Sequence, residues 1–143
     1  MIYTNEDGYN ITLREMIKKN EGYSDKPYRC SAKKLTIGWG HNLEAHGITK
    51  QIAELMLGED IQRAYYDILD TFPQFYMYSQ KRQVALIDLS FNLGKSTLLK
   101  FKKTIAAIRA EDWEEAAKEL EDSKYYKQVG NRAKRNVDLI RRG

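Results

Sequence analysis

Three chemically distinct side chains occur within sixteen positions in the first third of the sequence: the carboxylate of Glu21, the thiol of Cys30 and the hydroxyl of Thr36. Eight residues separate Glu21 from Cys30, and five separate Cys30 from Thr36. A carboxylic acid can protonate a leaving group, and a thiolate or hydroxyl can engage water or stabilise positive charge. The set is typical of acid-assisted hydrolysis, although a solvated glutamate at a helix end and a buried cysteine are each common without any such role.

The residues around this set predict the elements that position it. Thr12 and Glu15 have the spacing of a helix capping box, so a short helix should begin there and end near Glu21. From Tyr23 to Gly47 helical periodicity is absent, and the run Leu35–Gly40 indicates short strands and tight turns. We expect this segment to be the only β region, with the thiol and the hydroxyl in its hairpins.

The remaining two thirds of the chain have a helical pattern. Thr49 is a good N-cap for a long amphipathic helix that Pro73 ends near Phe72. Shorter helices are expected over residues 84–93 followed by Gly94, about 101–108, 112–120, and from 131 onward. We therefore predict one domain over residues 1–143 with an α+β, mainly α fold. Its small antiparallel β lobe covers about 22–48, and the long helix joins this lobe to a larger helical one.

Composition and charge limit the class of protein. A chain of 143 residues with one cysteine forms no intrachain disulfide and is long enough for one folded core. Its N-terminal segment carries Glu6 and Asp7, unlike a secretory signal, and no apolar run is long enough to span a bilayer. We therefore expect no signal peptide, no transmembrane segment and no stable membrane insertion. The net charge of +4 favours an anionic partner, but wall polymer, nucleic acid, membrane and a plain solvated face all fit it.

The spacing of Glu21, Cys30 and Thr36 resembles the catalytic signature of the phage-type lysozymes, the muramidase endolysins of glycoside hydrolase family 24. That signature is Glu, eight residues, Asp or Cys, five residues, Thr. The resemblance covers nearly the whole chain beyond the first ten residues. It continues through the segments Thr36–His41, Gly47–Lys50, Ala85–Ile87, Phe91–Gly94, Trp113–Ala117 and Asn131–Arg135.

The resemblance implies a two-lobed lysozyme-like fold that needs no cofactor and no metal. It also implies cleavage of the β-1,4 bond between N-acetylmuramic acid and N-acetylglucosamine in peptidoglycan. Such a reaction needs an acid that protonates the leaving oxygen and a second group that stabilises cationic character or engages water. Glu21 is implied to be the general acid, and we expect burial against apolar neighbours such as Tyr23 and Phe91 to favour its protonated form. Cys30 stands where many members carry aspartate, and Thr36 is implied to position the catalytic water.

Two further pairs carry over from the family. His41 is implied to lie beside the cleft with Asp60 as its acidic partner, and we interpret this pair as mainly structural. Arg132 is implied to lie near Glu21, where its positive charge would favour the ionised carboxylate.

Substrate contacts are implied at five positions, two of which, Asn42 and Glu119, differ from the usual family residues. The five positions are His41, Asn42, Phe91, Thr104 and Glu119. The loop between His41 and Ile48 is short, which trims the β lobe. Trp39 and Trp113 are expected to pack in cores, as tryptophan usually does.

Several other functions stay open at this point. A lytic transglycosylase also uses a glutamate acid but dispenses with the second carboxylate, and its anhydro-sugar product distinguishes it. A cysteine peptidase pairing Cys30 with His41 or His46, a zinc site on these three residues, and nucleic-acid binding by the basic C-terminus each lack a supporting motif. From a different class, a catalytically silent cell-wall-binding protein would not need Glu21, Cys30 and Thr36 in register.

The family resemblance also suggests a biological setting. We expect a monomer that acts on peptidoglycan glycan strands and does not bind nucleic acid. As a phage lysis enzyme it would accumulate in the host cytoplasm and reach the wall when a separate protein permeabilises the membrane. A tail-associated or bacterial role would use the same chemistry.

Overall fold

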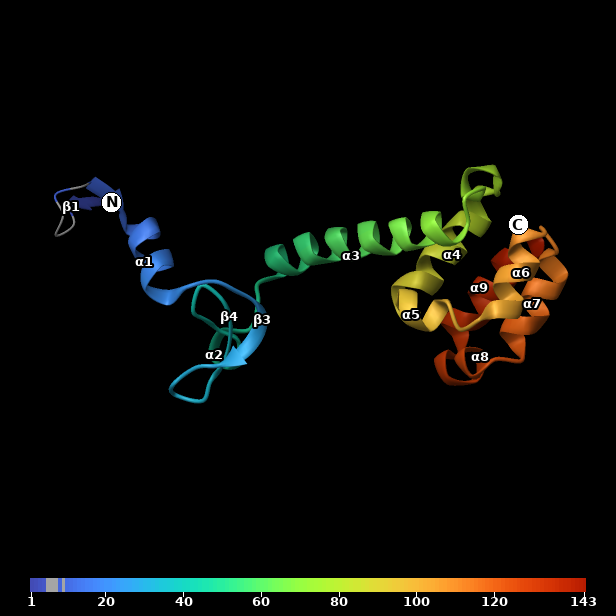
Figure 1. The fold of residues 1–143 in the computed structure, drawn as a ribbon. Helices are drawn as coiled ribbons and strands as arrows, with labels where there is room; N and C mark the ends of the chain where they lie inside the picture. Colours follow the sequence, from blue (N-terminus) through green and yellow to red (C-terminus); the bar gives the residue numbers. More distant parts are fainter. Residues whose placement is uncertain (5–7, 9) are drawn as a thin grey trace. The chain divides into compact units, whose positions relative to one another are not determined.

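The computed structural model describes residues 1–4, 8 and 10–143, and it divides the chain into two compact units. Unit 1 is Met1–Ala53 and unit 2 is Glu54–Gly143 (Figure 1). Glu6 and Asp7, which entered the expectation about the N-terminal segment, lie outside the described residues. The chain is mainly helical with a small three-stranded antiparallel sheet, which confirms the predicted α+β class.

Unit 1 places Glu21 at the end of its first long helix, α1 (Leu13–Glu21). The predicted capping box is present: the Thr12 hydroxyl accepts a hydrogen bond from the Glu15 N–H at 3.2 Å, and Glu15 Oε2 accepts one from the Thr12 N–H at 2.8 Å. Gly22 ends the helix in a positive-φ conformation and donates its N–H to the Lys18 carbonyl. Both ends of α1 are therefore fixed by local chemistry, and so is the place of Glu21.

The sheet of unit 1 follows directly. It consists of β3 (Ser24–Arg29), β4 (Leu35–Gly38) and β5 (His41–Asn42), with β4 in the middle. Tyr28 pairs with Thr36, and Thr36 pairs with Asn42. Directly paired residues share one face of an antiparallel sheet, so this register brings three polar side chains into one row. A short helix that the sequence did not predict, α2 (Leu43–His46), follows β5.

The prediction that residues 23–47 form the only β region is wrong. Strand β1 (Ile2–Thr4) pairs antiparallel with β2 (Asn10–Thr12), and Ile2 lies opposite Thr12. Both segments are rich in β-branched and aromatic residue types, which favour strands. The polar residues between them obscured this preference in the sequence.

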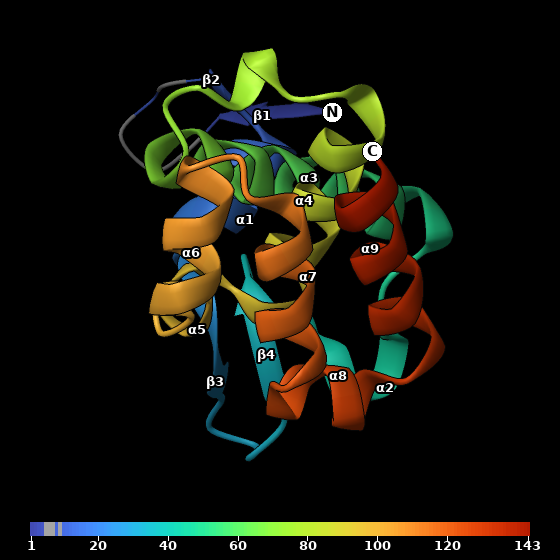
Figure 2. The ribbon, with the colours of Figure 1, turned by 90° about the vertical axis from the view of Figure 1, so that its right-hand side faces the viewer.

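Unit 2 is helical throughout its described elements. The long helix α3 (Lys50–Thr71) has its first turn in unit 1 and the rest in unit 2, with the Thr49 hydroxyl capping its start and Pro73 following its end, as predicted. Figure 2 shows α6, α7 and α9 side by side. The elements after α3 are η1 (Phe75–Met77), α4 (Gln80–Leu93), α5 (Lys95–Leu98), α6 (Lys102–Arg109), α7 (Trp113–Glu121), α8 (Lys124–Val129) and α9 (Asn131–Arg142). No helix of the described chain is both long and apolar enough to span a membrane.

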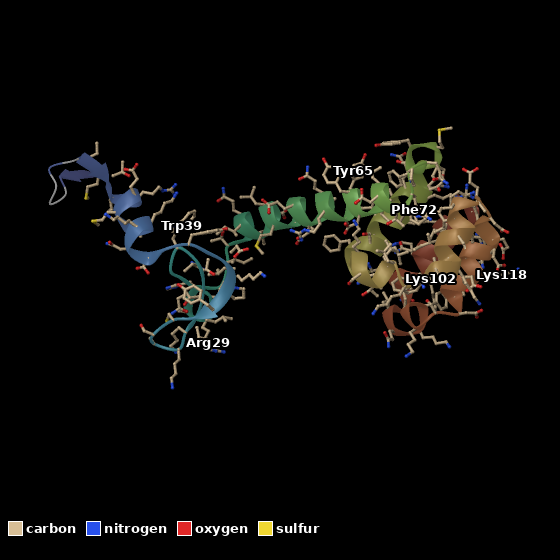
Figure 3. All side chains as sticks on the ribbon, viewed as in Figure 1. Arg29, Trp39, Tyr65, Phe72, Lys102 and Lys118 are labelled. Atoms are coloured by element: carbon tan, nitrogen blue, oxygen red, sulfur yellow. The ribbon has the colours of Figure 1, made fainter. Side chains whose placement is uncertain are left out.

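The core of unit 2 is built from apolar side chains of α3, η1 and the later helices. Phe72, labelled in Figure 3, is completely buried there together with Leu86 and Leu89. Trp113 packs edge-on against Tyr78 with ring centroids 4.8 Å apart, which confirms its predicted place in the core. Burial of this apolar surface is the main stabilising contribution to unit 2.

One buried polar group in this core has no hydrogen-bond partner among the described residues, namely the Ser90 hydroxyl on α4. An unsatisfied buried hydroxyl costs stability, so Ser90→Ala should raise the free energy of unfolding by about 1 kcal/mol. Urea unfolding followed by circular dichroism measures this change. Thr71→Val is the matched control, because the equally buried Thr71 hydroxyl donates to the Asp67 carbonyl at 2.7 Å and its removal should destabilise. A destabilised Ser90→Ala would show that the hydroxyl is satisfied.

Candidate functional site

The Glu21 carboxylate lies directly against the backbone of Gly40, in the turn between β4 and β5. A Cβ added at Gly40 would lie 2.6 Å from Glu21 Oε2 and 2.8 Å from Cδ, far closer than real contacts allow. Gly40 also has φ +73°, a conformation that favours glycine. Position 40 therefore has two independent reasons to carry no side chain, and one of them is the approach of the proposed acid.

Glu21 is solvent-exposed and lines a shallow pocket of about 330 Å³ within unit 1. The other lining residues are Gly22, Tyr23, Ser24 and Tyr28. Two tyrosine rings thus flank a carboxylate that is accessible to a ligand. The expectation that Glu21 is buried against apolar neighbours is wrong: Glu21 is exposed, and Tyr23, which lines the same pocket, is itself largely exposed.

Cys30 occupies the turn that joins β3 to β4. Its N–H donates to the Lys34 carbonyl at 3.0 Å, and its carbonyl accepts from the Lys33 N–H at 2.7 Å. The Lys34 N–H, the Thr36 hydroxyl and the Ala32 N–H are hydrogen-bond donors to the Cys30 sulfur, and they lower the pKa of the thiol below its ordinary value. The turn therefore favours a thiolate at Cys30.

Thr36 is buried beneath this turn, with 3% of its surface exposed. Its hydroxyl donates to the Lys34 carbonyl at 2.8 Å and also lies within hydrogen-bonding reach of the Cys30 sulfur. The structure thus brings Cys30 and Thr36 together, while their roles in catalysis stay predictions. Because the hydroxyl carries one proton, donation to the carbonyl and donation to a thiolate are alternatives.

A carboxylate that the sequence analysis missed holds this turn in place. Glu44 Oε1, at the start of α2, accepts hydrogen bonds from Arg29 Nη1 at 2.8 Å and from the Leu35 N–H at 3.0 Å. Arg29 Nη1 also donates to the Lys33 carbonyl at 3.0 Å. The Leu35 N–H, followed by Arg29, lowers the pKa of Glu44. Because Glu44 lies nine residues from Leu35 and fifteen from Arg29, no local spacing in the sequence indicated this clamp.

The polar groups of His41 and Asn42 organise the short segment that follows. His41 Nε2 lies 2.6 Å from the Gly47 carbonyl, and its ring centroid is 6.2 Å from that of His46. Asn42 Oδ1 accepts the Ala45 N–H at 3.0 Å and so caps α2. These bonds account for the compact turn over residues 41–47. A role of either residue in substrate binding stays a prediction.

The remaining site candidates belong to unit 2. Asp60 pairs with Arg63 at 2.9 Å. Arg132 forms a two-point contact with Asp88, at 2.8 and 2.9 Å, which together with a hydrogen bond from Asn136 lowers the pKa of Asp88. The expected pairings of Asp60 with His41 and of Arg132 with Glu21 join residues of different units, and they stay predictions.

The three implied substrate contacts of unit 2 line two different pockets. Phe91, on α4, lines an apolar pocket of about 380 Å³ together with Arg132, whose guanidinium lies 6.0 Å from the phenyl centroid. Thr104 and Glu119 line a second pocket of about 350 Å³ on α6 and α7. The structure therefore brings Thr104 and Glu119 together but places Phe91 in a different pocket.

The expectation that Trp39 packs in a core is wrong. Its surface is 45% exposed, and Figure 3 labels it beside the end of α1. Its ring lies 4.9 Å from the ring of Tyr23 at an interplanar angle of 41°, and Lys18 Nζ lies 4.3 Å from its centroid. Trp39 occupies the turn immediately before Gly40, where the chain leaves β4, and this position keeps it at the surface.

Within the residues that the structure describes, no three His, Cys, Asp or Glu side chains are grouped to hold a metal ion. Cys30 hydrogen-bonds with its own turn, and His41 bonds with the Gly47 carbonyl. The described arrangement is therefore one of an acid, a thiol and a hydroxyl.

Comparison with known proteins gives several matches. A family model described as phage lysozyme matches residues 18–142. Two probable T4-type lysozymes of Dictyostelium discoideum are 26% and 24% identical, over 92% of this chain and 95% of their own lengths. An endolysin of Acyrthosiphon pisum secondary endosymbiont phage 1 is 38% identical over 59% of this chain and 62% of its own length.

A longer protein matches as well. The pre-baseplate central spike protein Gp5 of Enterobacteria phage T4 is 26% identical over 96% of this chain, and the match covers 29% of that protein. The chain thus spans less than a third of the spike protein and nearly all of the Dictyostelium proteins.

The contact between Glu21 and Gly40 predicts the effect of a single methyl group. Gly40→Ala should displace the carboxylate and lower glycan-cleaving activity by about 10-fold or more, because small misplacements of catalytic groups are costly. Gly38→Ala is the matched control: Gly38 has φ +66° but nothing within 4 Å of an added Cβ, so it carries the backbone strain without the clash. Turbidity loss of peptidoglycan suspensions measures activity, and thermal unfolding measures stability. Equal activity losses in both variants would contradict the special role of position 40.

The donors around Cys30 predict a shifted titration. The pKa of the thiol should lie below that of an unperturbed cysteine, so alkylation by iodoacetamide should reach half its maximal rate at a lower pH than with a cysteine in an unstructured peptide. Thr36→Val removes one donor and should move this midpoint upward, whereas Thr36→Ser keeps the hydroxyl and should change it less. The chain has one cysteine, so mass spectrometry assigns the adduct without ambiguity. A wild-type midpoint at or above that of the peptide would contradict the hydrogen-bonding argument.

Proposed function

Because the chain belongs to the phage lysozyme family, a family of peptidoglycan hydrolases, we propose that it cleaves the β-1,4 bond between N-acetylmuramic acid and N-acetylglucosamine. The observation that carries this proposal is the accessible Glu21 carboxylate, held against Gly40 at one edge of a pocket with two tyrosine rings. The hairpin that follows supplies Cys30 and Thr36, whose hydroxyl lies within hydrogen-bonding reach of the Cys30 sulfur. An acid and two groups able to handle water or positive charge are what glycoside hydrolysis needs.

In this mechanism, Glu21 donates its proton to the glycosidic oxygen as the bond to the anomeric carbon breaks. Positive charge then develops on the sugar ring, and a water molecule adds its oxygen to the anomeric carbon. The negative charge of the Cys30 thiolate stabilises that positive charge and provides an acceptor for the proton that the water releases. The Thr36 hydroxyl retains acceptor capacity toward this water while it donates its own proton.

The lowered pKa of Cys30 is the reason to favour hydrolysis over transglycosylation. A lytic transglycosylase needs no group that activates water. In this chain, backbone donors and the Thr36 hydroxyl stabilise a thiolate at Cys30. Stabilisation of an anion next to a hydroxyl is useful when water is the second reactant. We therefore propose hydrolysis as the reaction and transglycosylation as the alternative that product analysis tests.

The other candidates have supporting roles in this proposal. Phe91, Thr104 and Glu119 supply additional contacts to the glycan from unit 2, and His41 and Asn42 supply contacts from unit 1. Asp60 and Arg132 support the site without acting on the bond. We propose that the chain works as a monomer and without a cofactor.

The relatives support two biological settings for the same reaction. An endolysin among them supports release of the enzyme to the wall through a membrane that a separate protein has permeabilised. A central spike protein among them supports action from a phage particle. We propose the endolysin setting, since that relative shows the higher identity.

Replacement of Glu21 tests the proposed function. Glu21→Gln should lower the rate of glycan cleavage by about 10²–10⁴-fold, because the amide cannot donate a proton to the leaving oxygen. Purified peptidoglycan is digested with the wild type and the variant, and mass spectrometry identifies the fragments. Glu59→Gln, which changes an exposed glutamate of α3, is the control and should cleave normally.

The products distinguish the alternatives. Fragments with reducing-end muramic acid that vanish with Glu21→Gln support the hydrolytic muramidase. Anhydromuramic products would identify a transglycosylase instead, and intact glycan after wild-type treatment would indicate a binding protein without catalysis.

A further inference from the structure

Unit 1 exposes three large aromatic side chains around the proposed acid. Tyr23 is 65% exposed, Trp39 45% and Tyr28 36%. Exposed aromatic surface that gathers in one place often marks a binding site, because its burial by a ligand is favourable. These rings therefore need an explanation beyond packing.

The cluster adjoins the Glu21 carboxylate through two separate parts of the chain. Tyr23 follows Glu21 by two residues and lines the same pocket, as does Tyr28 on β3. Trp39 immediately precedes Gly40, the residue that contacts the carboxylate. A ligand in this pocket would therefore meet an aromatic surface and the acid together.

The Tyr23 ring packs against a second aromatic ring of the cluster. Trp39 packs against it with ring centroids 4.9 Å apart, and Lys18 Nζ lies 4.3 Å from the Trp39 centroid. Lys18 and Tyr23 thus both contact the Trp39 ring. Tyr23 keeps the larger solvent-exposed surface of the two aromatic residues. A tyrosine also has only two side-chain torsions to fix, so ordering it costs little conformational entropy.

We propose that Tyr23 is a saccharide-stacking residue, which holds the apolar face of a pyranose ring next to the glycosidic oxygen that Glu21 protonates. Trp39 and Lys18 are positioning residues for this ring. A sugar fits better than a peptide or an aliphatic group, because the pocket is shallow and pairs a flat aromatic surface with polar Glu21 and Ser24. The inference deepens the proposed function and rests on it for the identity of the sugar as a peptidoglycan saccharide.

Tryptophan fluorescence offers a direct test, since the chain has two tryptophans. Trp113→Phe leaves Trp39 as the single reporter beside Tyr23, and Glu21→Gln in the same chain prevents turnover. This double variant is titrated with an N-acetylglucosamine tetramer and, separately, with soluble uncross-linked glycan strands. We expect a saturable change in Trp39 emission with at least one of the two.

Variants at position 23 measure the contribution of the ring. Tyr23→Leu in the reporter background should weaken binding by about 3- to 10-fold, whereas Tyr23→Phe, which keeps the ring, should bind within about 2-fold of the reporter. Tyr76→Leu is the matched control, because Tyr76 is 67% exposed in unit 2 and packs against Phe75. With the otherwise wild-type chain, Tyr23→Leu should raise KM and leave kcat nearly unchanged. Circular dichroism establishes that each variant is folded.

The outcomes separate this inference from the proposed function. Saturable binding by the reporter that Tyr23→Leu weakens supports the stacking role, even if the wild type fails to cleave peptidoglycan and the proposed function falls. Unchanged affinity and KM in folded Tyr23→Leu would overturn the stacking role while leaving cleavage by Glu21 intact. A loss of affinity in Tyr23→Phe equal to that in Tyr23→Leu would also overturn it, because the ring would then not be the group that matters.

Discussion

The close approach of the Glu21 carboxylate to the Gly40 backbone is the contact on which unit 1 depends as a site. It joins the last residue of α1 to the turn between β4 and β5, so the acid and the hairpins occupy fixed positions relative to one another. The capping box at Thr12 and the positive-φ Gly22 set the two ends of α1 and thereby the position of its final side chain. The caps of α1 thus set the position of Glu21, and the absence of a side chain at Gly40 leaves room for its carboxylate.

The part of the candidate site around Cys30 is set by hydrogen bonds to the sulfur. Backbone N–H groups and a hydroxyl surround the Cys30 sulfur, and they provide the stabilisation that a solvated carboxylate would obtain from water. Glu44 and Arg29 tie the ends of this turn to each other across the hairpin. Because most of these donors belong to the backbone, the pKa of Cys30 depends mainly on the shape of the turn, and the Thr36 hydroxyl adds a side-chain contribution.

Local rules explain which features the sequence predicted. The α1 helix, the long α3 helix and the Gly94 stop follow from caps and periodicity, and the hairpin region that holds Cys30 and Thr36 follows from the absence of helical periodicity. The exposure of Trp39 and the Glu44 clamp depend on contacts between residues distant in sequence, which no local pattern carries. The strands β1 and β2 were missed because each is only three residues long, although most of their residues favour strands, and polar residues separate the two.

The two units are stabilised in different ways, and this difference bears on motion. Unit 2 has a buried apolar core, whereas none of the apolar side chains that the structure describes in unit 1 is fully buried. Backbone hydrogen bonds without an apolar core open at low free-energy cost, while core helices open only with the whole fold. Amide hydrogens of the hairpins around Cys30 and Thr36 should therefore exchange with solvent faster than those of α4 or α7. The proposed chemistry then belongs to the unit whose backbone opens at the lower free-energy cost, and the buried core belongs to the other unit.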